Sequence, residues 1–474
     1  MLPNLTLELV DGVRVVVPDS LNLITTYVLS EQRDWFEDEI KFLRRLIRPG
    51  QKVIDIGANC GVYALTMARL VGPTGRIWAF EPASATANLL AAGIAANNFT
   101  NLELIRSALS SAPGTAQLSI NENSELNELV RGARPTGATE TVSCITLDDS
   151  MAKHGWKDID FIKIDAEGEE ANILRAGTRF LATESPLIQY EIKAAAGLNL
   201  ELVERFAQLG YQSYRLVPGI DLLVPFDIEE AVDGYLLNLF CCKPDRAARL
   251  AGQGFLLEAA VDISATRLPD FHRVSDSTDP HGWRKALVGL PYGALLADEW
   301  VQRMRGNESA AVEESLLYYA LSRDTSLQAA ERFAALTASY QGFKRLCETQ
   351  PANLRLSSLA RVAVDYGARS VAVDALRRLC DLILQNQGQA NTSEPFLAPG
   401  ARFDTVSPGG RQALLRWIAA AAFEELERNQ HFSSYYTGKS EQRRLEMIRD
   451  MGFGSEEMKR RLLLIQRRFG AVAS

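Results

Sequence analysis

The chain has 474 residues, which exceeds one ordinary hydrophobic core and predicts two or three domains. Its formal charge of −8 gives no general attraction to nucleic acid or to an anionic membrane, so we expect neither as a partner. No basic flank precedes an apolar run at the start, and no apolar run is long enough to span a membrane; both features predict a cytoplasmic protein. Six scattered cysteines, without a C-x-x-C pair, indicate reduced core thiols.

The first 50 residues predict a small unit that packs on the following domain. Two apolar strands at residues 5–10 and 13–17 flank Asp11-Gly12, which is a two-residue hairpin signal. Residues 31–47 carry apolar side chains near helical spacing, and Arg48-Pro49-Gly50 ends that pattern. We therefore expect a β hairpin and one helix before the first core strand.

Strands and helices then alternate through residues 51–245, which we predict to be one α/β domain with about seven core strands and right-handed βαβ connections. Between residues 112 and 143 the alternation is interrupted by an inserted hairpin, with strands at 115–120 and 139–143 and a polar loop between them. The core strands are expected at 53–56, 76–80, 102–106, 161–164, 187–191, 211–217 and 235–241, and the helices at 61–71, 85–96, 169–176 and 200–209.

Residues 246–474 differ in character from the rest of the chain. They contain long Ala/Leu/Arg/Glu-rich segments with helical periodicity and few strand signals, so we predict a separate α-helical region of unknown role. The polar stretches at residues 270–281 and 386–410 are expected to connect its parts.

The most informative motif is a turn after the first core strand. Asp55, Gly57, Asn59 and Gly61 form a D-x-G-x-N-x-G pattern, and Glu81 ends the next strand. The G-x-G-x-x-G spacing that binds a pyrophosphate is missing, which disfavours an NAD-type oxidoreductase. An acid and an amide at this turn instead suit a ligand that carries positive charge. S-adenosylmethionine is such a ligand, and the segment resembles the first cofactor loop of the Rossmann-like methyltransferases.

A second motif narrows this resemblance. Residues 161–169 read FIKIDAEGE, residues 146–149 read TLDD, and the strand at 187–191 ends in Glu191. Together with the cofactor turn, these segments resemble the FkbM family of methyltransferases over residues 35–245. The resemblance implies a seven-stranded Rossmann-like fold that binds S-adenosylmethionine.

The resemblance also implies roles for the residues of the first motif. It assigns the turn of Asp55, Gly57, Asn59 and Gly61 to the amino-acid part of the cofactor. Glu81 is placed to accept hydrogen bonds from both ribose hydroxyls, because a carboxylate has two acceptor oxygens. Methyltransferases of this shape contact adenine after the third strand, which here means Ser107 and Ala108.

The candidate catalytic residues are Asp165, Glu167 and Glu191. Asp165 ends the fourth strand, where it is placed to orient the acceptor, remove its proton or stabilise the sulfonium, and Glu191 ends the neighbouring strand. Paired carboxylates raise one pKa toward neutrality, and they also suit a divalent cation. No histidine joins them at ligand spacing, so we predict no metal. Lys163 is a pairing partner for one of these acids.

These inferences favour an O-methyltransferase that acts on a hydroxyl of a glycan or another polyhydroxylated metabolite, with a role in polysaccharide biosynthesis. The acceptor class follows from the family resemblance. The helical region would present the acceptor, dock another glycan-assembly enzyme or form a homo-oligomer. The alternative is a catalytically inactive methyltransferase fold that serves as a scaffold, with a partner bound by the helical region.

Overall fold

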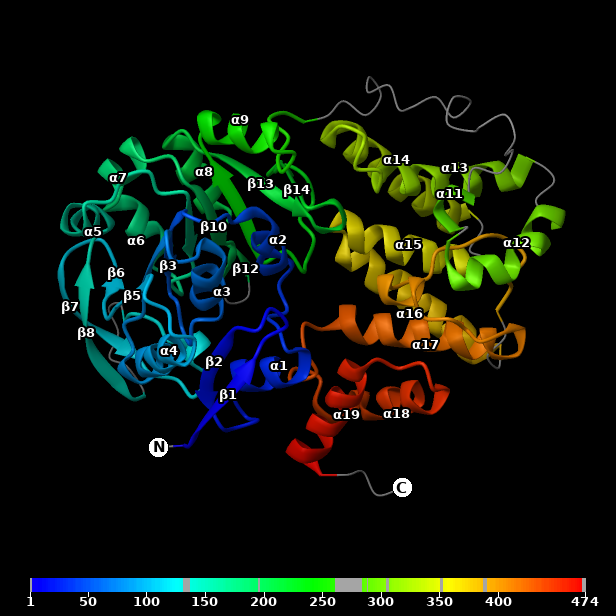
Figure 1. The fold of residues 1–474 in the computed structure, drawn as a ribbon, viewed down its shortest axis with the longest axis horizontal. Helices are drawn as coiled ribbons and strands as arrows, with labels where there is room; N and C mark the ends of the chain where they lie inside the picture. Colours follow the sequence, from blue (N-terminus) through cyan, green and yellow to red (C-terminus); the bar gives the residue numbers. More distant parts are fainter. Residues whose placement is uncertain are drawn as a thin grey trace. The chain divides into compact units, whose positions relative to one another are not determined.

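The computed structural model describes residues 2–130, 137–194, 197–260, 284–287, 289–303, 307–349, 353–386 and 390–470. The chain forms two compact units (Figure 1). The α/β unit contains Met1–Leu216, Leu223–Val232 and Leu236–Glu258, and the helical unit contains Val217–Leu222, Asp233–Tyr235 and Ala259–Ser474. The connector predicted at residues 270–281 lies outside the described residues.

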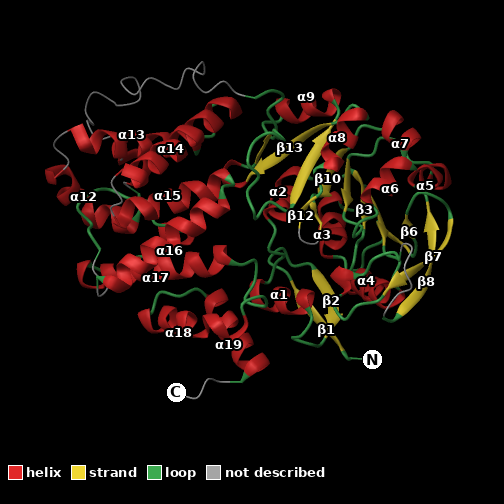
Figure 2. Cartoon of the chain, turned by 180° about the vertical axis from the view of Figure 1, so that it is seen from behind, coloured by secondary structure: helices red, strands yellow, loops and turns green. Residues whose placement is uncertain are grey.

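One large sheet forms the centre of the α/β unit. Its strands are β3 (Lys52–Ile56), β4 (Arg76–Phe80), β5 (Leu102–Ile105), β9 (Phe161–Ile164), β10 (Leu187–Glu191), β13 (Gln212–Val217), β14 (Leu222–Pro225) and β15 (Asn238–Cys242). They lie in the order β14-β13-β15-β10-β9-β3-β4-β5, and Figure 2 draws the strands in yellow. The strands from β10 to β5 in this order run parallel, whereas β15 is antiparallel to β10 and β13. All seven predicted core strands are present, and β14 is an additional strand at the edge.

Both faces of the sheet are covered by helices, which explains the continuous apolar runs of its strands. Val53 and Ile54 are neighbours in β3, both are fully buried, and they belong to two separate hydrophobic clusters on opposite faces. The Val53 cluster includes side chains from α2 (Asp38–Leu46), α3 (Val62–Val71), α4 (Ser84–Ala96) and α9 (Pro244–Gly252), and the Ile54 cluster includes side chains from α5 (Leu147–His154), α6 (Glu170–Arg175), α7 (Thr178–Thr183) and α8 (Glu201–Gln208).

The predicted N-terminal hairpin is present, with a longer turn than expected. Its strands are β1 (Asn4–Glu8) and β2 (Arg14–Pro18), which pair antiparallel. Gly12, at φ +79°, donates its N–H to the Leu9 carbonyl at 2.9 Å, and the Leu9 N–H donates to the Val13 carbonyl at 2.8 Å. The left-handed glycine therefore closes a bulged turn.

The single helix predicted at residues 31–47 is wrong, because the segment is divided between two helices. The first, α1 (Ile24–Gln32), ends at Arg33, which has φ +57°. The second, α2, begins at Asp38. Asp34 lies between the two helices, and the guanidinium of Arg44 in α2 binds both of its carboxylate oxygens at 2.7 Å. This contact holds the residues between the helices, called the α1–α2 linker below (residues 33–37), in a non-helical path.

The inserted hairpin between β5 and β9 is confirmed. Its strands β7 (Gly114–Ser119) and β8 (Thr139–Ile145) pair antiparallel, and the short strand β6 (Ala108–Leu109) joins β8. The loop between β7 and β8 contains the 3₁₀ turn η1 (Ser124–Leu126), and residues 131–136 of this loop lie outside the described part. A two-stranded ribbon of β11 (Lys193–Ala194) and β12 (Gly197–Leu198) follows β10.

The helical unit is predominantly α-helical, as predicted. Each helix from α13 to α19 packs against the next in the chain. The described part of the stretch at residues 386–410, which leaves out residues 387–389, is more than the polar connector we predicted, because Phe396, Leu397 and Ala398 are buried and Tyr292 hydrogen-bonds to the backbone there. The described helices are α11 (Arg284–Leu287), α12 (Pro291–Arg303), α13 (Asn307–Ser322), α14 (Ala329–Thr349), α15 (Asn353–Tyr366), α16 (Arg369–Gln385), α17 (Arg411–Gln430), α18 (Gln442–Met451) and α19 (Glu456–Phe469).

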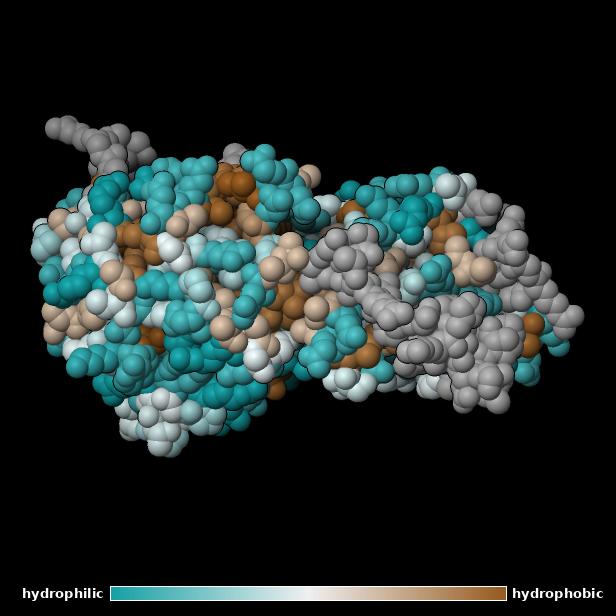
Figure 3. All heavy atoms as spheres, turned by 90° about the horizontal axis from the view of Figure 1, so that it is seen from above, coloured by the Kyte–Doolittle hydropathy of each residue, from teal (hydrophilic) through white to brown (hydrophobic). Residues whose placement is uncertain are grey.

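The surface in Figure 3 is mixed in character: hydrophilic side chains are spread over the described part of this face, and apolar side chains form small spots between them. Among the described residues, no helix combines the length and the apolar character needed to span a membrane. All six cysteines are buried and none is in a disulfide.

Candidate active site

A cleft in the α/β unit opens at the carboxyl ends of the parallel strands β3, β4 and β9. Ligands of open α/β sheets bind at this end, because the strand-to-helix turns converge there. Its lining includes the predicted residues Asp55, Gly57, Asn59, Glu81, Ser107, Ala108, Asp165 and Glu167. Gly61 lies next to lining residues at the start of α3, and Glu191 lies at the end of β10.

The turn after β3 requires glycine at Gly57. This residue has φ +76°, and a Cβ atom built on it would lie 1.7 Å from the carbonyl oxygen of Asp165. The turn therefore passes directly against the end of β9. Gly61, at φ +88°, is similarly confined, because a Cβ atom there would lie 2.3 Å from a methyl group of Leu90.

Glu81 is fixed in the same turn by two backbone donors. Its Oε2 accepts from the Asn59 N–H at 2.9 Å, and its Oε1 accepts from the Ala83 N–H at 2.8 Å. Burial raises the pKa of Glu81 to about 7, although these two hydrogen bonds act in the opposite direction. Each oxygen retains a further lone pair, so the fixed carboxylate can accept hydrogen bonds from a pair of ligand hydroxyls.

Asp55 is a buried acid whose two carboxylate oxygens lack hydrogen-bond partners among the described residues. The residue is only 1% exposed. Burial raises its pKa to about 6, against the opposing charge of Lys163. Native proteins rarely leave such a group unsatisfied, so Asp55 fits a site for a cationic or hydrogen-bond-donating ligand.

Ser107 and Ala108 line the cleft after β5, where the third-strand position was predicted. The side chains around them are apolar: Phe80, Leu109, Leu118 and Leu129 line the same cleft and are buried. This end of the cleft therefore suits a flat, weakly polar ring.

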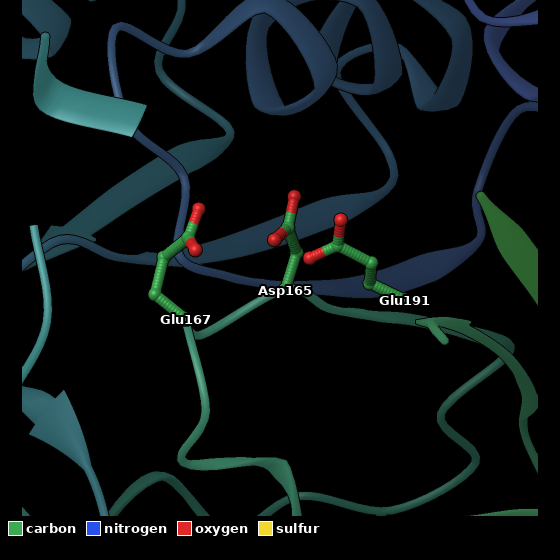
Figure 4. A group of neighbouring side chains, drawn as sticks. All are labelled: Asp165, Glu167 and Glu191. Atoms are coloured by element: carbon green, nitrogen blue, oxygen red, sulfur yellow. The ribbon is translucent and has the colours of Figure 1, made fainter. Parts of the chain in front are cut away.

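The structure brings the three candidate catalytic acids together. Asp165, Glu167 and Glu191 each offer a carboxylate oxygen within 4.8 Å of the others, and Figure 4 shows the three side chains on one side of the β9 end. Desolvation and the charge of Asp165 raise the pKa of Glu167 to about 8 and of Glu191 to about 9. We call these three residues the carboxylate cluster.

Lys163 pairs with this cluster, as the sequence indicated. Its Nζ lies 2.6 Å from Oδ2 of Asp165, and the residue is only 5% exposed. Burial opposes the ammonium charge, but the carboxylates of Asp165, Asp55 and Glu37 outweigh it and raise the pKa of Lys163. Oxygen donors at this spacing also suit a hard divalent cation, although the ammonium already places a positive charge at Asp165.

The cleft as a whole is rich in acids. Lys163 is the one lysine or arginine among the described residues that line it. The acids, called the acidic lining below, are Glu37, Asp55, Glu81, Glu125, Asp165, Glu167 and Glu169.

Sequence reasoning missed a wall of the cleft that the α1–α2 linker provides. Trp35 and Glu37 line the cleft, together with Tyr63 of α3. Tyr63 Oη donates a hydrogen bond to the Glu37 carboxylate, and burial raises the pKa of Glu37. The sequence places both linker residues inside an amphipathic pattern, so it carried no signal that they face a ligand site.

One family model matches the part of the chain that contains most of this site. Residues 55–213 match the model of the methyltransferase FkbM domain. No curated protein matches the chain.

Similar solved structures include a SAM-dependent O-methyltransferase from Thermotoga maritima, with 14% identity over 51% of this chain and 78% of that chain and a TM-score of 0.28. A SAM-dependent methyltransferase from Aquifex aeolicus shows 14% identity over 45% of this chain and 91% of that chain, with a TM-score of 0.27. An rRNA methylase from Streptococcus thermophilus shows 12% identity over 43% of this chain and 93% of that chain, with a TM-score of 0.25.

Proposed function

We propose that this chain, whose residues 55–213 belong to the FkbM methyltransferase family, methylates a hydroxyl of a glycan or another polyhydroxylated metabolite. Its cofactor is S-adenosylmethionine, which supplies the methyl group when bound. We place the reaction in the domain predicted at residues 51–245. The observation that carries the proposal is the cleft itself, which combines the glycine turn, the fixed Glu81 carboxylate and the carboxylate cluster in one site.

The cofactor-binding roles follow from the chemistry of each group. Asp55 and the turn from Gly57 to Asn59 hold the amino-acid part, because Asp55 is a buried carboxylate without a partner. Glu81 accepts from the ribose hydroxyls through the lone pairs that its two backbone donors leave open. Ser107 and Ala108 contact the adenine beside the apolar end of the cleft.

Asp165 is the group that takes the proton from the acceptor hydroxyl. Lys163 binds its Oδ2 and holds the side chain in place, and the described residues place no hydrogen bond on the other carboxylate oxygen. Glu167 and Glu191 have pKa values raised to about 8 and about 9, so near neutral pH both are mainly protonated. In that state they donate hydrogen bonds to acceptor oxygens, and most of the catalysis is positioning and exclusion of water.

The first experiment is calorimetric titration of the full chain with S-adenosylmethionine, S-adenosylhomocysteine and NAD. We expect binding of the first two and none of NAD, with the affinity lost in Glu81→Ala. Glu103→Ala is the matched control, because this acid also lies on a sheet strand but pairs with Arg76 at the surface. If none of the three compounds binds, the result would contradict the proposal and favour the scaffold alternative.

The second experiment tests the transfer itself. The full chain is incubated with isotopically labelled S-adenosylmethionine and a panel of sugars, and methylated products are identified by mass spectrometry. We expect a methyl ether on at least one sugar hydroxyl, and about a hundredfold slower formation of it with Asp165→Asn. Label that appears only on nitrogen or carbon acceptors would contradict O-methylation.

A further inference from the structure

The wall formed by Trp35 and Glu37 adjoins the carboxylate cluster. Both residues line the cleft, and Glu37 is close enough to Lys163 and Asp165 for their charges to shift its pKa. The charge of Glu37 also acts on the pKa of Glu191. The apolar end, by contrast, contains Ser107 and Ala108. The two linker residues are therefore on the side of the cleft where the acceptor has to approach the acids.

The linker that carries this wall is anchored before any ligand binds. The Arg44 guanidinium binds both oxygens of Asp34 at 2.7 Å and Asp11 Oδ2 at 3.0 Å. Asp34 Oδ1 in turn accepts the backbone N–H of Trp35 at 2.9 Å. Trp35 packs partly on the hydrophobic core and is partly exposed. Its indole is thus a preorganised surface, and binding to it costs little ordering of the protein.

The charge of the cleft limits what this surface can accept. Lys163 is the one lysine or arginine of the described lining, and its ammonium is already paired with Asp165. An anionic acceptor would have to lose its hydration next to the acidic lining without gaining a counter-ion from the described lining residues, which is costly.

We propose that Trp35 and Glu37 form the acceptor site, and that this site takes a hydroxyl-bearing ring without negative charge and rejects phosphorylated or carboxylated acceptors. The inference rests on the proposed function and adds the charge class of its acceptor. The ring lies against the indole face, where its C–H groups meet the electron-rich surface. Glu37 accepts a ring hydroxyl, since its carboxylate has acceptor capacity beyond its contacts with the Tyr63 and Trp35 side chains.

The test is saturation-transfer NMR on the full chain with saturating S-adenosylhomocysteine. The probes are methyl β-D-glucopyranoside, glucosamine, glucose 6-phosphate and glucuronate, each alone at the same concentration. We expect transfer to the neutral sugar, the amino sugar or both, and at least tenfold less to the two anions. Equal or stronger transfer to either anion overturns the inference, and so does the absence of transfer to all four.

Two variants locate the site. Trp35→Ala is expected to reduce saturation transfer at least tenfold, whereas Trp35→Phe keeps an aromatic face and stays within about threefold of the original chain. Both should bind S-adenosylhomocysteine as the original chain does. If Trp35→Ala does not fold, Glu37→Gln replaces it, and glucuronate transfer should then rise relative to the neutral sugar. Unchanged probe binding in a folded Trp35→Ala, or an unchanged glucuronate ratio in Glu37→Gln, overturns the inference.

The same experiments separate the two proposals. Loss of S-adenosylhomocysteine binding by the original chain in calorimetry would remove the proposed function. If the cofactor binds normally but saturation transfer to the four sugars does not follow the expected order, only the proposed acceptor site would be rejected.

Discussion

Replacing Gly57 by alanine is the sharpest test of the cofactor turn. The added Cβ would lie 1.7 Å from the Asp165 carbonyl oxygen, half the 3.4 Å at which ordinary contact begins. The left-handed φ of +76° costs a non-glycine residue about 1–2 kcal/mol. Overpacking adds about 1–3 kcal/mol. We therefore expect Gly57→Ala to lower the free energy of unfolding by roughly 2–5 kcal/mol.

The clash also has to displace either the cofactor turn or the end of β9 that carries Asp165. A misplacement of about 1 Å can cost roughly a hundredfold in rate, so methyl transfer should fall by at least that factor. The assay is chemical unfolding together with S-adenosylhomocysteine calorimetry. Gly155→Ala is the matched control, because Gly155 has φ +63° and nothing lies within 4 Å of its added Cβ. Equal unfolding energies and normal cofactor affinity in both variants would refute the steric reasoning.

Three further predictions concern the acids of the cleft. Asp165→Asn should leave S-adenosylhomocysteine affinity nearly unchanged and slow transfer by about a hundredfold, measured in single turnover; undiminished transfer would make Asp165 structural and Glu191 the better base. The pKa of Glu191 is raised to about 9, so this group holds its proton more tightly in the folded chain than in the unfolded chain, and its contribution to stability decreases as pH rises from about 5 to about 9. In calorimetric scans, the unfolding temperature of Glu191→Gln should fall less steeply with rising pH than that of the original chain. An identical slope in both proteins would contradict this prediction. Asp55→Asn should raise the unfolding temperature of the free chain, because it removes a buried charge without a hydrogen-bond partner, and it should shrink the increase produced by S-adenosylmethionine; a lower temperature for the free variant would disprove this.

The sheet was predictable because its strands are covered on both faces. Strand β3 reads KVIDI and β9 reads FIKI, and such apolar runs between turn residues are typical of buried parallel strands. Parallel strands place their carboxyl ends at one edge, so Asp165 and Glu191 could be paired from the sequence alone. The additional strand β14 was missed because a four-residue LLVP segment carries too little pattern to separate it from a loop.

The α1–α2 linker was not predictable, because long-range contacts determine its path. The apolar residues of the segment fit one helix, and the spacing alone gave no reason for a break. The break depends on Arg44, which binds Asp34 and also Asp11, a residue 33 positions before Arg44 in the chain. Such tertiary contacts override local propensity. The same contacts bring Trp35 to the cleft, so the missed break and the missed wall have one cause.

The number of acids in the cleft exceeds what proton removal requires. One carboxylate suffices to accept the proton of a hydroxyl, yet the acidic lining contains seven acids. Burial raises the pKa of Asp55 to about 6 and of Glu81 to about 7, so ionisation of these two carboxyl groups reduces the stability of the free chain. A sulfonium cofactor is a cation, and its charge offsets that cost when it binds. The remaining acids then act on the acceptor, because an anionic competitor would find no counter-ion among the described lining residues other than Lys163, which is already paired with Asp165.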